Sequence, residues 1–535
     1  MYDIALTRSL FPAQTSEPIW EVTVGGKLQE VAARDPSAPA LVEVTVEGKT
    51  ARRWTYGELL ADSEDLALAL ASRFAPGEKI AVWAHNIPEW VLMEYACALA
   101  GLVLVTANPA FQPKELRYVL EQSGAVALFQ VESYRGNPMA DIGREAVSGL
   151  KAIREVIFLT DRAALYREGP RPAALPDVKP GDPAQIQYTS GTTGFPKGAM
   201  LSHRGLVNNA RFYAGRCGTT AATTWINPMP LFHTAGCGMI TLGSMQAGCR
   251  MVLIGQFDPV VVLRVINQER ANIILGVPTM ILALVEAQGR TPVDCSSVEL
   301  ISSGGAMVPP DLVRSATKAF GCAFSILYGQ TEYSPTITQH HATDSFDDIC
   351  NTVGQPIAQT SVSVRRPTDN AILPIADVGE ICVHGPCMML GYHANPEATA
   401  ETIDSDGWLH SGDLGTMDER GYVRVTGRVK EMIIRGGENF FPAEIENALL
   451  EHPNIAEIAV VGLPDEKWGE IIAAFYRTEG DGEVDVADLR AHCRARLAPQ
   501  KTPTVWERVT AFPLTGSGKI QKFSLRDQYI ARQKT

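Results

Sequence analysis

The chain has 535 residues, more than one hydrophobic core normally supports, because single cores stop growing at roughly 250 to 300 residues. Apolar residues make up 45% of it and charged residues 20%, which is typical of a globular protein and excludes a disordered or fibrous one. The formal net charge of −13 disfavours nucleic acid and anionic lipid surfaces as partners, since both carry charge of the same sign.

Cysteine and histidine spacing gives no sign of a disulfide framework or a zinc site. The ten cysteines include no CxxC pair, and the ten histidines show no HExxH spacing. The first residues, MYDIALTRSLFPAQ, contain an acid at position 3 and lack the apolar segment of a secretory signal. We therefore expect reduced thiols and a cytoplasmic location. The uncharged residues 225–249 have the length of a membrane span, but their glycines, two prolines and histidine favour a buried strand and loop.

Short β-branched runs alternate along the chain with amphipathic segments of helical length. Strands are predicted at residues 80–82, 102–106, 154–159 and 250–253, and helices at 56–74 and 113–122. This alternation predicts an α/β fold in which helices cover the sheets.

The pattern changes around Gly427. Residues 421–452 predict a strand, a charged turn, a second strand, a glycine turn and a helix that begins at Pro442. We place a domain boundary here, with a large N-terminal domain of several α/β subdomains at 1–427 and a small α+β domain at 428–535.

The most informative motif is YTSGTTGFPKG, residues 188–198, which follows a strand-like segment. Its glycines let backbone amides turn toward an anion, its hydroxyl groups donate hydrogen bonds, and Lys197 adds a positive charge. A Walker loop requires glycine at 196 and Ser or Thr at 198, so Pro196 and Gly198 exclude a P-loop NTPase. A passive linker is the alternative, which the ordered alternation of Ser, Thr and Gly disfavours. The predicted phosphate-binding residues are Thr189, Ser190, Gly191, Thr192, Thr193, Gly194 and Lys197.

This motif resembles the phosphate-loop signature of the adenylate-forming superfamily, which comprises acyl-CoA synthetases, luciferases and nonribosomal peptide adenylation domains. The resemblance covers nearly the whole chain, in the order of the family, through PLFHTAG (230–236), SSGGAMVP (302–309), YGQTE (328–332), SGD (411–413), GRVKEMIIRGGENFFPAEIE (427–446) and PLTGSGKIQK (513–522). It implies an enzyme that uses Mg²⁺ and ATP to convert a carboxylic acid to its acyl-adenylate, and then transfers the acyl group to coenzyme A.

The resemblance also implies roles for nucleotide-binding residues. Tyr328 offers a flat face to a purine, Thr331 a hydroxyl group to the α-phosphate, and Glu332 an oxygen ligand to Mg²⁺. Asp413 resembles the carboxylate that accepts both ribose hydroxyl groups. The segment Gly304, Gly305 and Ala306 resembles the backbone beside the adenine, and it also reads as a tight turn between strand and helix. Gly329, Gln330 and Arg428 complete the implied nucleotide site.

The C-terminal motifs imply a moving domain. Lys519 resembles a catalytic lysine that bridges the acid and the phosphate in the transition state. Arg428 and Lys430 match a hinge about which the small domain rotates between the two half-reactions. The implied CoA-binding residues are Arg435, Gly436, Gly437, Glu438 and Trp468. For Trp468, a half-buried core tryptophan is an equal alternative.

The class of carboxylic acid that the resemblance implies as substrate is narrowed by residues 231–241, LFHTAGCGMIT. Peptide-type adenylation domains place an aspartate there to bind an amino acid's ammonium group, and this chain has no carboxylate in the segment. Medium-chain fatty acyl and related aryl or short thioether acid CoA ligases resemble the chain most. The implied acyl site, mostly small and uncharged, consists of His233, Thr234, Gly238, Ser303, Gly304, Gly329, Tyr333 and Ser334. For His233, a core histidine is an equal alternative.

Two other functions stay open. An acyl-AMP ligase that loads a carrier protein would release pyrophosphate without forming acyl-CoA, although we find no insertion of the kind that branch carries. A catalytically silent nucleotide-binding regulatory protein would bind ATP without turnover, which the presence of Lys519, Glu332 and Asp413 disfavours. The expected partners are a carboxylic acid, ATP and CoA, with a homodimer left open.

Overall fold

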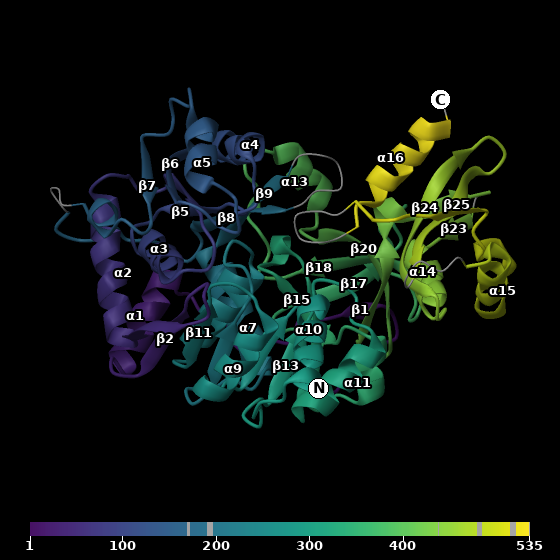
Figure 1. Cartoon of the computed structure of the whole chain (residues 1–535), viewed down its shortest axis with the longest axis horizontal. Helices are drawn as coiled ribbons and strands as arrows, with labels where there is room; N and C mark the ends of the chain where they lie inside the picture. The colour runs from purple at the N-terminus through teal and green to yellow at the C-terminus, as the bar shows by residue number, and fades with distance from the viewer. Residues whose placement is uncertain (168–171, 190–195, 437, 479–483, 514–519, 534–535) are drawn as a thin grey trace.

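The structure is a computed structural model (Figure 1), and it describes residues 1–167, 172–189, 196–436, 438–478, 484–513 and 520–533. Within these residues the strands form four sheets. Three of them lie with their helices in the larger part of the molecule, and the fourth lies in the smaller part that carries the C-terminus. The predicted α/β fold, with a large N-terminal and a small C-terminal domain, is confirmed.

The first sheet has seven strands, of which β4 to β8 run parallel. Its order is β19 (Gly391–Tyr392), β9 (Lys197–Ser202), β8 (Pro183–Thr189), β5 (Val103–Thr106), β4 (Lys79–Trp83), β6 (Ala125–Gln130) and β7 (Glu155–Phe158). Strand β8 ends at Thr189 and β9 begins at Lys197, so the antiparallel pair β8–β9 flanks the predicted phosphate loop.

The second sheet has nine strands, and its central six are parallel. Its order is β16 (Gln355–Pro356), β15 (Thr336–Gln339), β14 (Ala323–Gly329), β13 (Leu300–Ser303), β12 (Ile273–Gly276), β10 (Thr224–Asn227), β11 (Arg250–Ile254), β2 (Pro39–Val44) and β3 (Thr50–Thr55). The predicted adenine segment follows β13, and the YGQTE motif spans the end of β14.

Helices fill the space between the first two sheets and cover their outer faces. One core joins side chains of both sheets with those of α1 (Val24–Arg34), α2 (Tyr56–Ala71), α3 (Pro88–Leu99), α7 (His203–Arg216), the π-helix η1 (Ala235–Leu242) and α8 (Gly243–Gln246). A second core lies under α9 (Pro259–Glu269), α10 (Pro278–Arg290) and α11 (Pro310–Phe320). Each of these last three begins with proline, because the first helical residue has no intrahelical N–H bond to lose.

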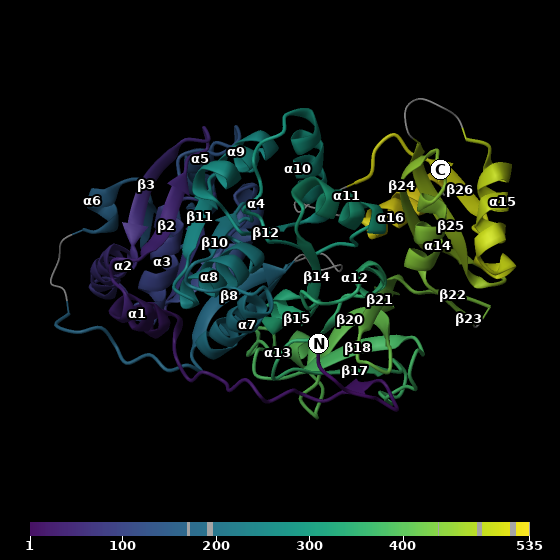
Figure 2. The ribbon, with the colours of Figure 1, turned by 90° about the horizontal axis from the view of Figure 1, so that it is seen from below.

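The third sheet is antiparallel, in the order β1 (Leu10–Phe11), β17 (Ser361–Arg365), β18 (Gly379–His384), β20 (Leu409–Met417) and β21 (Val423–Arg428). Figure 2 shows the purple N-terminal chain running from β1, beside β17, across the molecule to α1. Segments from opposite ends of the sequence therefore form one sheet.

The fourth sheet forms the C-terminal part, in the order β23 (Glu438–Phe440), β22 (Ile433–Arg435), β25 (Gly469–Thr478) and β24 (Ile455–Asp465), with β26 (Val505–Arg508) beside β25. Helices α14 (Pro442–Leu450) and α15 (Val486–Arg496) share one core with this sheet, and α16 (Lys522–Gln533) shares another. The remaining short elements are α4 (Pro113–Ser123), α5 (Met139–Val147), α6 (Arg162–Leu165), η2 (Thr331–Tyr333), α12 (Phe346–Asn351), α13 (Pro396–Thr402), η3 (Val429–Glu431) and η4 (Pro499–Lys501).

The predicted elements agree with the structure. The four predicted strands are β4, β5, β7 and β11, and the two predicted helices are α2 and α4. Helix α2 begins with a capping box in which Thr55 and Glu58 each bind the other's backbone N–H. It ends at Ala71, three residues before the predicted end.

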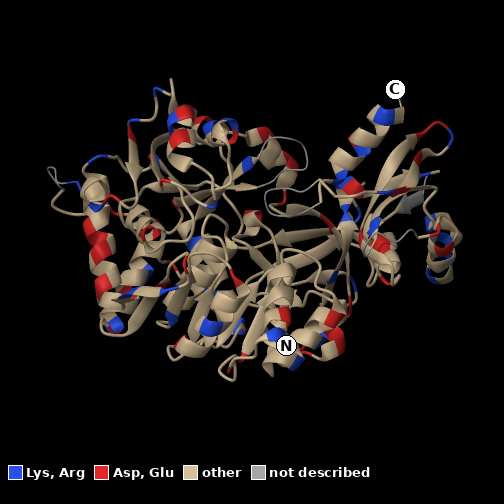
Figure 3. Cartoon of the chain, in the orientation of Figure 1, with Lys and Arg blue, Asp and Glu red and all other residues tan. Residues whose placement is uncertain are grey.

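The uncharged residues 225–249 are buried in the core and begin with the strand β10, as predicted, but the π-helix η1 and helix α8 occupy most of the predicted loop. Among the described residues, none of the helices combines the length and hydropathy that a membrane crossing requires. Lys and Arg are interspersed with Asp and Glu over both parts of the chain (Figure 3), so the excess negative charge is spread over the molecule.

Candidate active site

Three predicted nucleotide-binding residues from separate strands meet around Asp413. The Tyr328 hydroxyl group, from β14, donates a 2.8 Å hydrogen bond to Asp413 Oδ2. Arg428 Nε lies 3.2 Å from Asp413 Oδ1, because Asp413 on β20 pairs directly with Arg428 on β21. Burial, together with the charge of Asp413, raises the pKa of Tyr328 well above its ordinary value, so the phenol stays a donor. We call Tyr328, Asp413 and Arg428 the Asp413 cluster.

A second cluster joins the YGQTE motif to the end of the phosphate-loop motif, although the two lie far apart in the sequence. Glu332, in η2, accepts a 2.7 Å hydrogen bond at Oε1 from the Tyr392 hydroxyl group. Lys197 Nζ lies 4.9 Å from the centre of the Tyr392 ring, because β19 pairs with β9. Burial raises the pKa of Glu332, against the opposing effects of Tyr392 and Lys197. We call these three residues the Glu332 cluster.

Tyr392 is the member of the Glu332 cluster that the sequence did not predict. It lies in the segment MMLGYHANPEAT, residues 388–399, where a lone tyrosine does not indicate a chemical role. Its role depends on the pairing of β19 with β9, and that pairing is not encoded locally.

The phosphate loop is described only at its two ends. Thr189 and Lys197 face each other across β8 and β9, and the Thr189 hydroxyl group donates a 3.4 Å bond to the Lys197 carbonyl oxygen. Ser190, Gly191, Thr192, Thr193 and Gly194 lie outside the described residues, as do Gly437 and Lys519. Thr331 and Gln330, which follow Gly329, lie beside Glu332 in the sequence and are partly exposed.

Close packing requires two glycines of the predicted nucleotide site, and backbone conformation favours a third. A Cβ atom on Gly304 would lie 2.5 Å from the Leu327 carbonyl oxygen, and one on Gly329 would lie 1.9 Å from the Pro335 carbonyl oxygen. Gly305 has a φ of +76°, in the left-handed region that favours glycine. The segment is thus a tight turn after β13, which leaves Gly305 and Ala306 exposed.

The predicted acyl-site residues of η1 lie at the start of a π-helix, a form that recurs at functional sites. His233 is exposed, so the alternative of a core histidine is wrong. Thr234 Oγ1 is buried without a hydrogen-bond partner among the described residues. A Cβ atom on Gly238 would meet Leu206 at 3.7 Å, an ordinary contact distance. The glycine therefore leaves room for about a methyl group along this helix.

Three other predicted acyl-site side chains are engaged elsewhere. The Ser303 hydroxyl group donates to the Gly276 carbonyl oxygen at 2.9 Å. The Tyr333 ring is fully buried in the core of the third sheet, and its hydroxyl group binds Thr360 Oγ1 at 2.9 Å. The Ser334 hydroxyl group is buried and donates to the Cys387 carbonyl oxygen at 2.8 Å. The prediction that the Tyr333 and Ser334 side chains line the acyl site is wrong, because both point into packed structure.

Of the predicted CoA-binding residues, Gly436 and Trp468 are exposed beside the fourth sheet, and Arg435 on β22 is partly buried. Trp468 is 43% exposed, which fits both a CoA contact and the alternative of a half-buried tryptophan. The Arg435 guanidinium carbon and Lys467 Nζ lie 5.3 and 5.1 Å from the Trp468 ring centre. Gly436 has a φ of +62° and donates its N–H to the Trp468 carbonyl oxygen. Glu438 is described only by its backbone, in β23.

The predicted hinge residue Lys430 is exposed in the single turn η3, between the third and fourth sheets. Its neighbour Glu431 forms a 2.8 Å ion pair with Lys522 of α16, and Lys522 also lies 2.8 Å from Glu446 of α14. The turn η3 is thereby tied to two helices of the C-terminal part.

The chain matches known families and structures over nearly all of its length. Residues 28–393 match the AMP-binding enzyme family, and residues 444–519 match the AMP-binding enzyme C-terminal domain. The chain is 33% identical to the human mitochondrial medium-chain acyl-CoA ligase ACSF2, over 95% of this chain and 87% of that protein.

Two solved structures are similar as well. ATP-bound MatB from Rhodopseudomonas palustris is 28% identical with a TM-score of 0.83, and o-succinylbenzoate CoA synthetase (MenE) from Bacillus subtilis, with its acyl-adenylate intermediate, is 29% identical with a TM-score of 0.82. Both similarities cover 95% of this chain and 99% of the other. Apo MatB gives a TM-score of 0.76 over the same shares.

Proposed function

Since this chain belongs to the AMP-binding enzyme family and is an AMP-forming acid:CoA ligase, we propose that it activates a medium-chain fatty acid or a related aryl or thioether acid. In the first step the carboxylate attacks the α-phosphorus of ATP, the acyl-adenylate forms and pyrophosphate leaves. In the second, the sulfur of CoA attacks the acyl carbon and AMP leaves. The observation that carries the proposal is the convergence of the YGQTE, PKG and SGD motifs in the Asp413 and Glu332 clusters.

The Asp413 cluster suits recognition of a ribose. A carboxylate has two acceptor oxygens, which match the two hydroxyl donors of a ribose. Tyr328 and Arg428 each approach one of these oxygens and so fix the plane of the carboxylate. Asp413 would therefore hold the nucleotide, while the exposed turn at Gly305 and Ala306 would lie beside its adenine.

The Glu332 cluster suits a magnesium ion and the phosphates. Glu332 is a hard oxygen donor that Tyr392 orients, and Lys197 brings a compact positive charge to the same place. These residues fit a Mg²⁺ ion held by Glu332, which would neutralise charge on the phosphates when bound. Thr189, Lys197 and Thr331 would then donate to phosphate oxygens.

We propose that the domains at 1–427 and 428–535 rotate about Lys430 between the two steps, with Lys519 acting in the first and the surface around Trp468 receiving CoA in the second. The position of η3 between the third and fourth sheets supports a hinge there. The higher TM-score to ATP-bound than to apo MatB supports a nucleotide-binding arrangement of the domains in this structure. An exposed tryptophan ring flanked by Arg435 and Lys467 suits the purine and phosphates of CoA.

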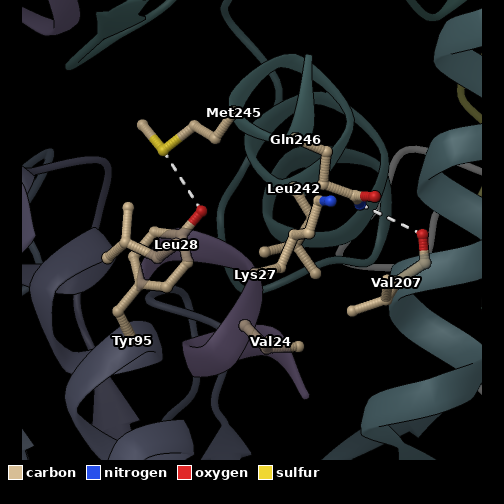
Figure 4. Close-up of a pocket in the computed structure, with 8 residues that line it drawn as sticks. All are labelled: Val24, Lys27, Leu28, Tyr95, Val207, Leu242, Met245 and Gln246. Carbon is tan, nitrogen blue, oxygen red and sulfur yellow. Dashed lines mark hydrogen bonds between the residues drawn. The ribbon is translucent and has the colours of Figure 1, made fainter. Parts of the chain in front are cut away.

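The helices beyond the predicted acyl site favour a substrate acid whose apolar tail has a limited length. Thr234 caps the start of η1, Gly238 lies within it, and Leu242 at its end lines a cavity of about 10 Å³ (Figure 4). The cavity lies between α1, α3, α7 and α8, and is lined by Val24, Lys27, Leu28, Tyr95, Val207, Leu242, Met245 and Gln246. The Tyr95 hydroxyl group donates to Met245 Sδ at 3.2 Å across it. We propose that the acyl tail extends along η1 toward this cavity and that Met245 limits its length.

A pyrophosphate-release screen over fatty, aryl and sulfur-containing acids, with and without CoA, tests the proposal. Pyrophosphate should appear only with Mg-ATP and a suitable acid, and thioester and AMP only when CoA is added. Pyrophosphate release without any acyl-CoA would indicate a ligase that loads a carrier protein, and binding of ATP without release would indicate a silent regulatory protein. Since the reaction consumes ATP and CoA, we expect the protein to act in a compartment that supplies both, such as the cytoplasm.

A further inference from the structure

A histidine lies between two carboxylates beside the Asp413 cluster. His410 on β20 pairs directly with Cys382 on β18. Its Nδ1 atom lies 2.8 Å from Glu380 Oε2 and 3.5 Å from Cys382 Sγ, and its Nε2 atom lies 3.3 Å from Asp404 Oδ2. Each ring nitrogen thus has a carboxylate acceptor, which favours a doubly protonated imidazolium.

The surroundings keep this arrangement charged. Cys382 and Glu380 raise the pKa of His410 to about 11. Of the two, the carboxylate supplies the charge, because burial raises the pKa of the Cys382 thiol and keeps it neutral. Arg365 of β17 lies 3.6 Å from Asp404 and balances the second carboxylate. The imidazolium and the guanidinium together neutralise Glu380 and Asp404.

Glu380 connects this arrangement to the nucleotide site. Its second oxygen, Oε1, accepts a 2.9 Å hydrogen bond from the backbone N–H of Gly412. Gly412 has a φ of +73° and directly precedes Asp413, whose own N–H binds the Ser411 hydroxyl group. The orientation of the Asp413 carboxylate therefore depends on where Glu380 holds the backbone of Gly412.

We propose that His410 is a positioning residue for nucleotide binding: held between Glu380 and Asp404, its ring fixes Glu380, and Glu380 fixes the turn that presents Asp413 to the ribose of ATP. This inference rests on the proposed role of Asp413.

A metal ion is the competing explanation for the same side chains. The ligand atoms of Glu380, Cys382 and His410 all lie within 4.8 Å of one another, and these residue types bind zinc. A metal on Nδ1 would displace the proton that Glu380 accepts. Because Glu380 and Asp404 occupy the two nitrogens as acceptors, the geometry favours the proton over the metal.

The test compares His410→Gln and Glu380→Gln with a control, His384→Gln. His384 is an exposed histidine at the end of β18 whose ring contacts Trp408. We expect both test variants to raise the Kd for AMP, measured by calorimetry, and the KM for ATP by roughly 10-fold, with kcat and the KM for the acid within about twofold of the original. The double variant should lose no more AMP affinity than either single variant, because both substitutions act through the same contact of Glu380 with Gly412. The control should bind AMP as the original chain does.

Three results would overturn the inference. The first is unchanged AMP affinity in His410→Gln while Asp413→Asn loses it; if Asp413→Asn also binds AMP normally, the ribose assignment itself fails. The second is an equal fall in AMP affinity, acid affinity and Tm in both test variants, which indicates a general structural role. The third is one equivalent of zinc in the purified protein that Cys382→Ser removes, which assigns the cluster to a metal.

Discussion

Tyr392 is the residue whose removal tests the Glu332 cluster most directly. In Tyr392→Phe the Glu332 carboxylate loses its orienting donor, and hydrogen bonds to charged groups contribute about 1.5 to 3 kcal/mol. We expect kcat/KM for Mg-ATP to fall roughly 10- to 100-fold, with a higher Mg²⁺ requirement in the pyrophosphate assay.

Tyr422→Phe is the matched control for this change. Tyr422 donates a 2.7 Å hydrogen bond to Asp344, another tyrosine–carboxylate contact in the N-terminal part. It should lower Tm without altering the Mg²⁺ requirement. An equal Mg²⁺ effect in both variants would contradict the role of Tyr392.

Glu94 predicts a pH dependence of stability. This carboxyl group of α3 is buried, accepts a 2.6 Å bond from Gln185 and leaves Oε2 without a partner among the described residues. Burial raises its pKa from 4.5 to about 8. Between these values the folded chain keeps a proton that the unfolded chain releases, so stability falls as the pH rises from about 4.5 to 8.

Glu94→Gln mimics the protonated acid and should remove this loss. We expect the variant to unfold at higher denaturant concentration than the original chain at pH 8, by about 1 to 3 kcal/mol in the free energy of unfolding, and to match it near pH 4.5. Unfolding curves at the two pH values measure the difference. A gain of the same size in the free energy of unfolding at both pH values would show that the charge of Glu94 is not the cause of the gain.

Some residues of the candidate site could be predicted from the sequence alone, and others could not. Thr189, Lys197, Tyr328, Glu332 and Asp413 could be proposed from the sequence because their motifs combine chemistry with fixed spacing, and the structure places Tyr328 against Asp413. The side chains of Tyr333 and Ser334 were misassigned because the backbone turn after η2 decides which way they point. His233 had two interpretations that only its exposure could separate, whereas the partial exposure of Trp468 fits both of its interpretations.

At the scale of elements, η1 and α8 should set the length of the acyl tail. Met245→Ala removes three heavy atoms from the wall of the cavity at the end of η1. We expect the preferred fatty acid to lengthen by about two carbons, with unchanged KM for ATP and a loss of roughly 2 kcal/mol in stability.

Met251→Ala, on β11, is the control, since Met251 is equally buried but does not line the cavity. It should lose similar stability without a change in chain-length preference. The same chain-length preference in the Met245→Ala variant and the original chain would show that Met245 does not limit the length of the acyl tail.

The turn η3 should matter for the second step more than for the first. Lys430→Pro restricts φ at the proposed hinge. We expect thioester formation to slow roughly 10-fold or more while pyrophosphate release changes by less than about threefold. Lys430→Ala, which keeps backbone freedom, should restore the second step. Normal CoA transfer in Lys430→Pro would place the hinge elsewhere.

The elements themselves were predictable where the spacing of apolar residues clearly matched a strand or a helix, as in β4, β5, α2 and α4. The pairing of elements was not. The third sheet joins residues 10–11 to residues 361–365, and β19 joins β9, through contacts whose partners lie far apart in the chain. Local spacing carries no information about such pairs, so the number and order of sheets had to come from the structure.

For the whole molecule, the two half-reactions should be separable by one substitution. Lys519→Ala removes the proposed cation of the first transition state, so we expect acyl-adenylate formation to fall roughly 100-fold or more. Transfer to CoA from supplied acyl-adenylate should stay within about threefold, because the proposed rotation withdraws Lys519 from that step. Single-turnover assays of each step measure both rates, and equal losses would refute the division of labour.

The ion pairs of Lys522 have a mechanical consequence. Glu431 directly follows the proposed hinge residue Lys430, so its ion pair with Lys522 joins the start of α16 to the turn η3. The second ion pair of Lys522, with Glu446, joins the same lysine to α14. Under the proposed rotation about Lys430, η3, α14 and α16 would therefore move together rather than independently.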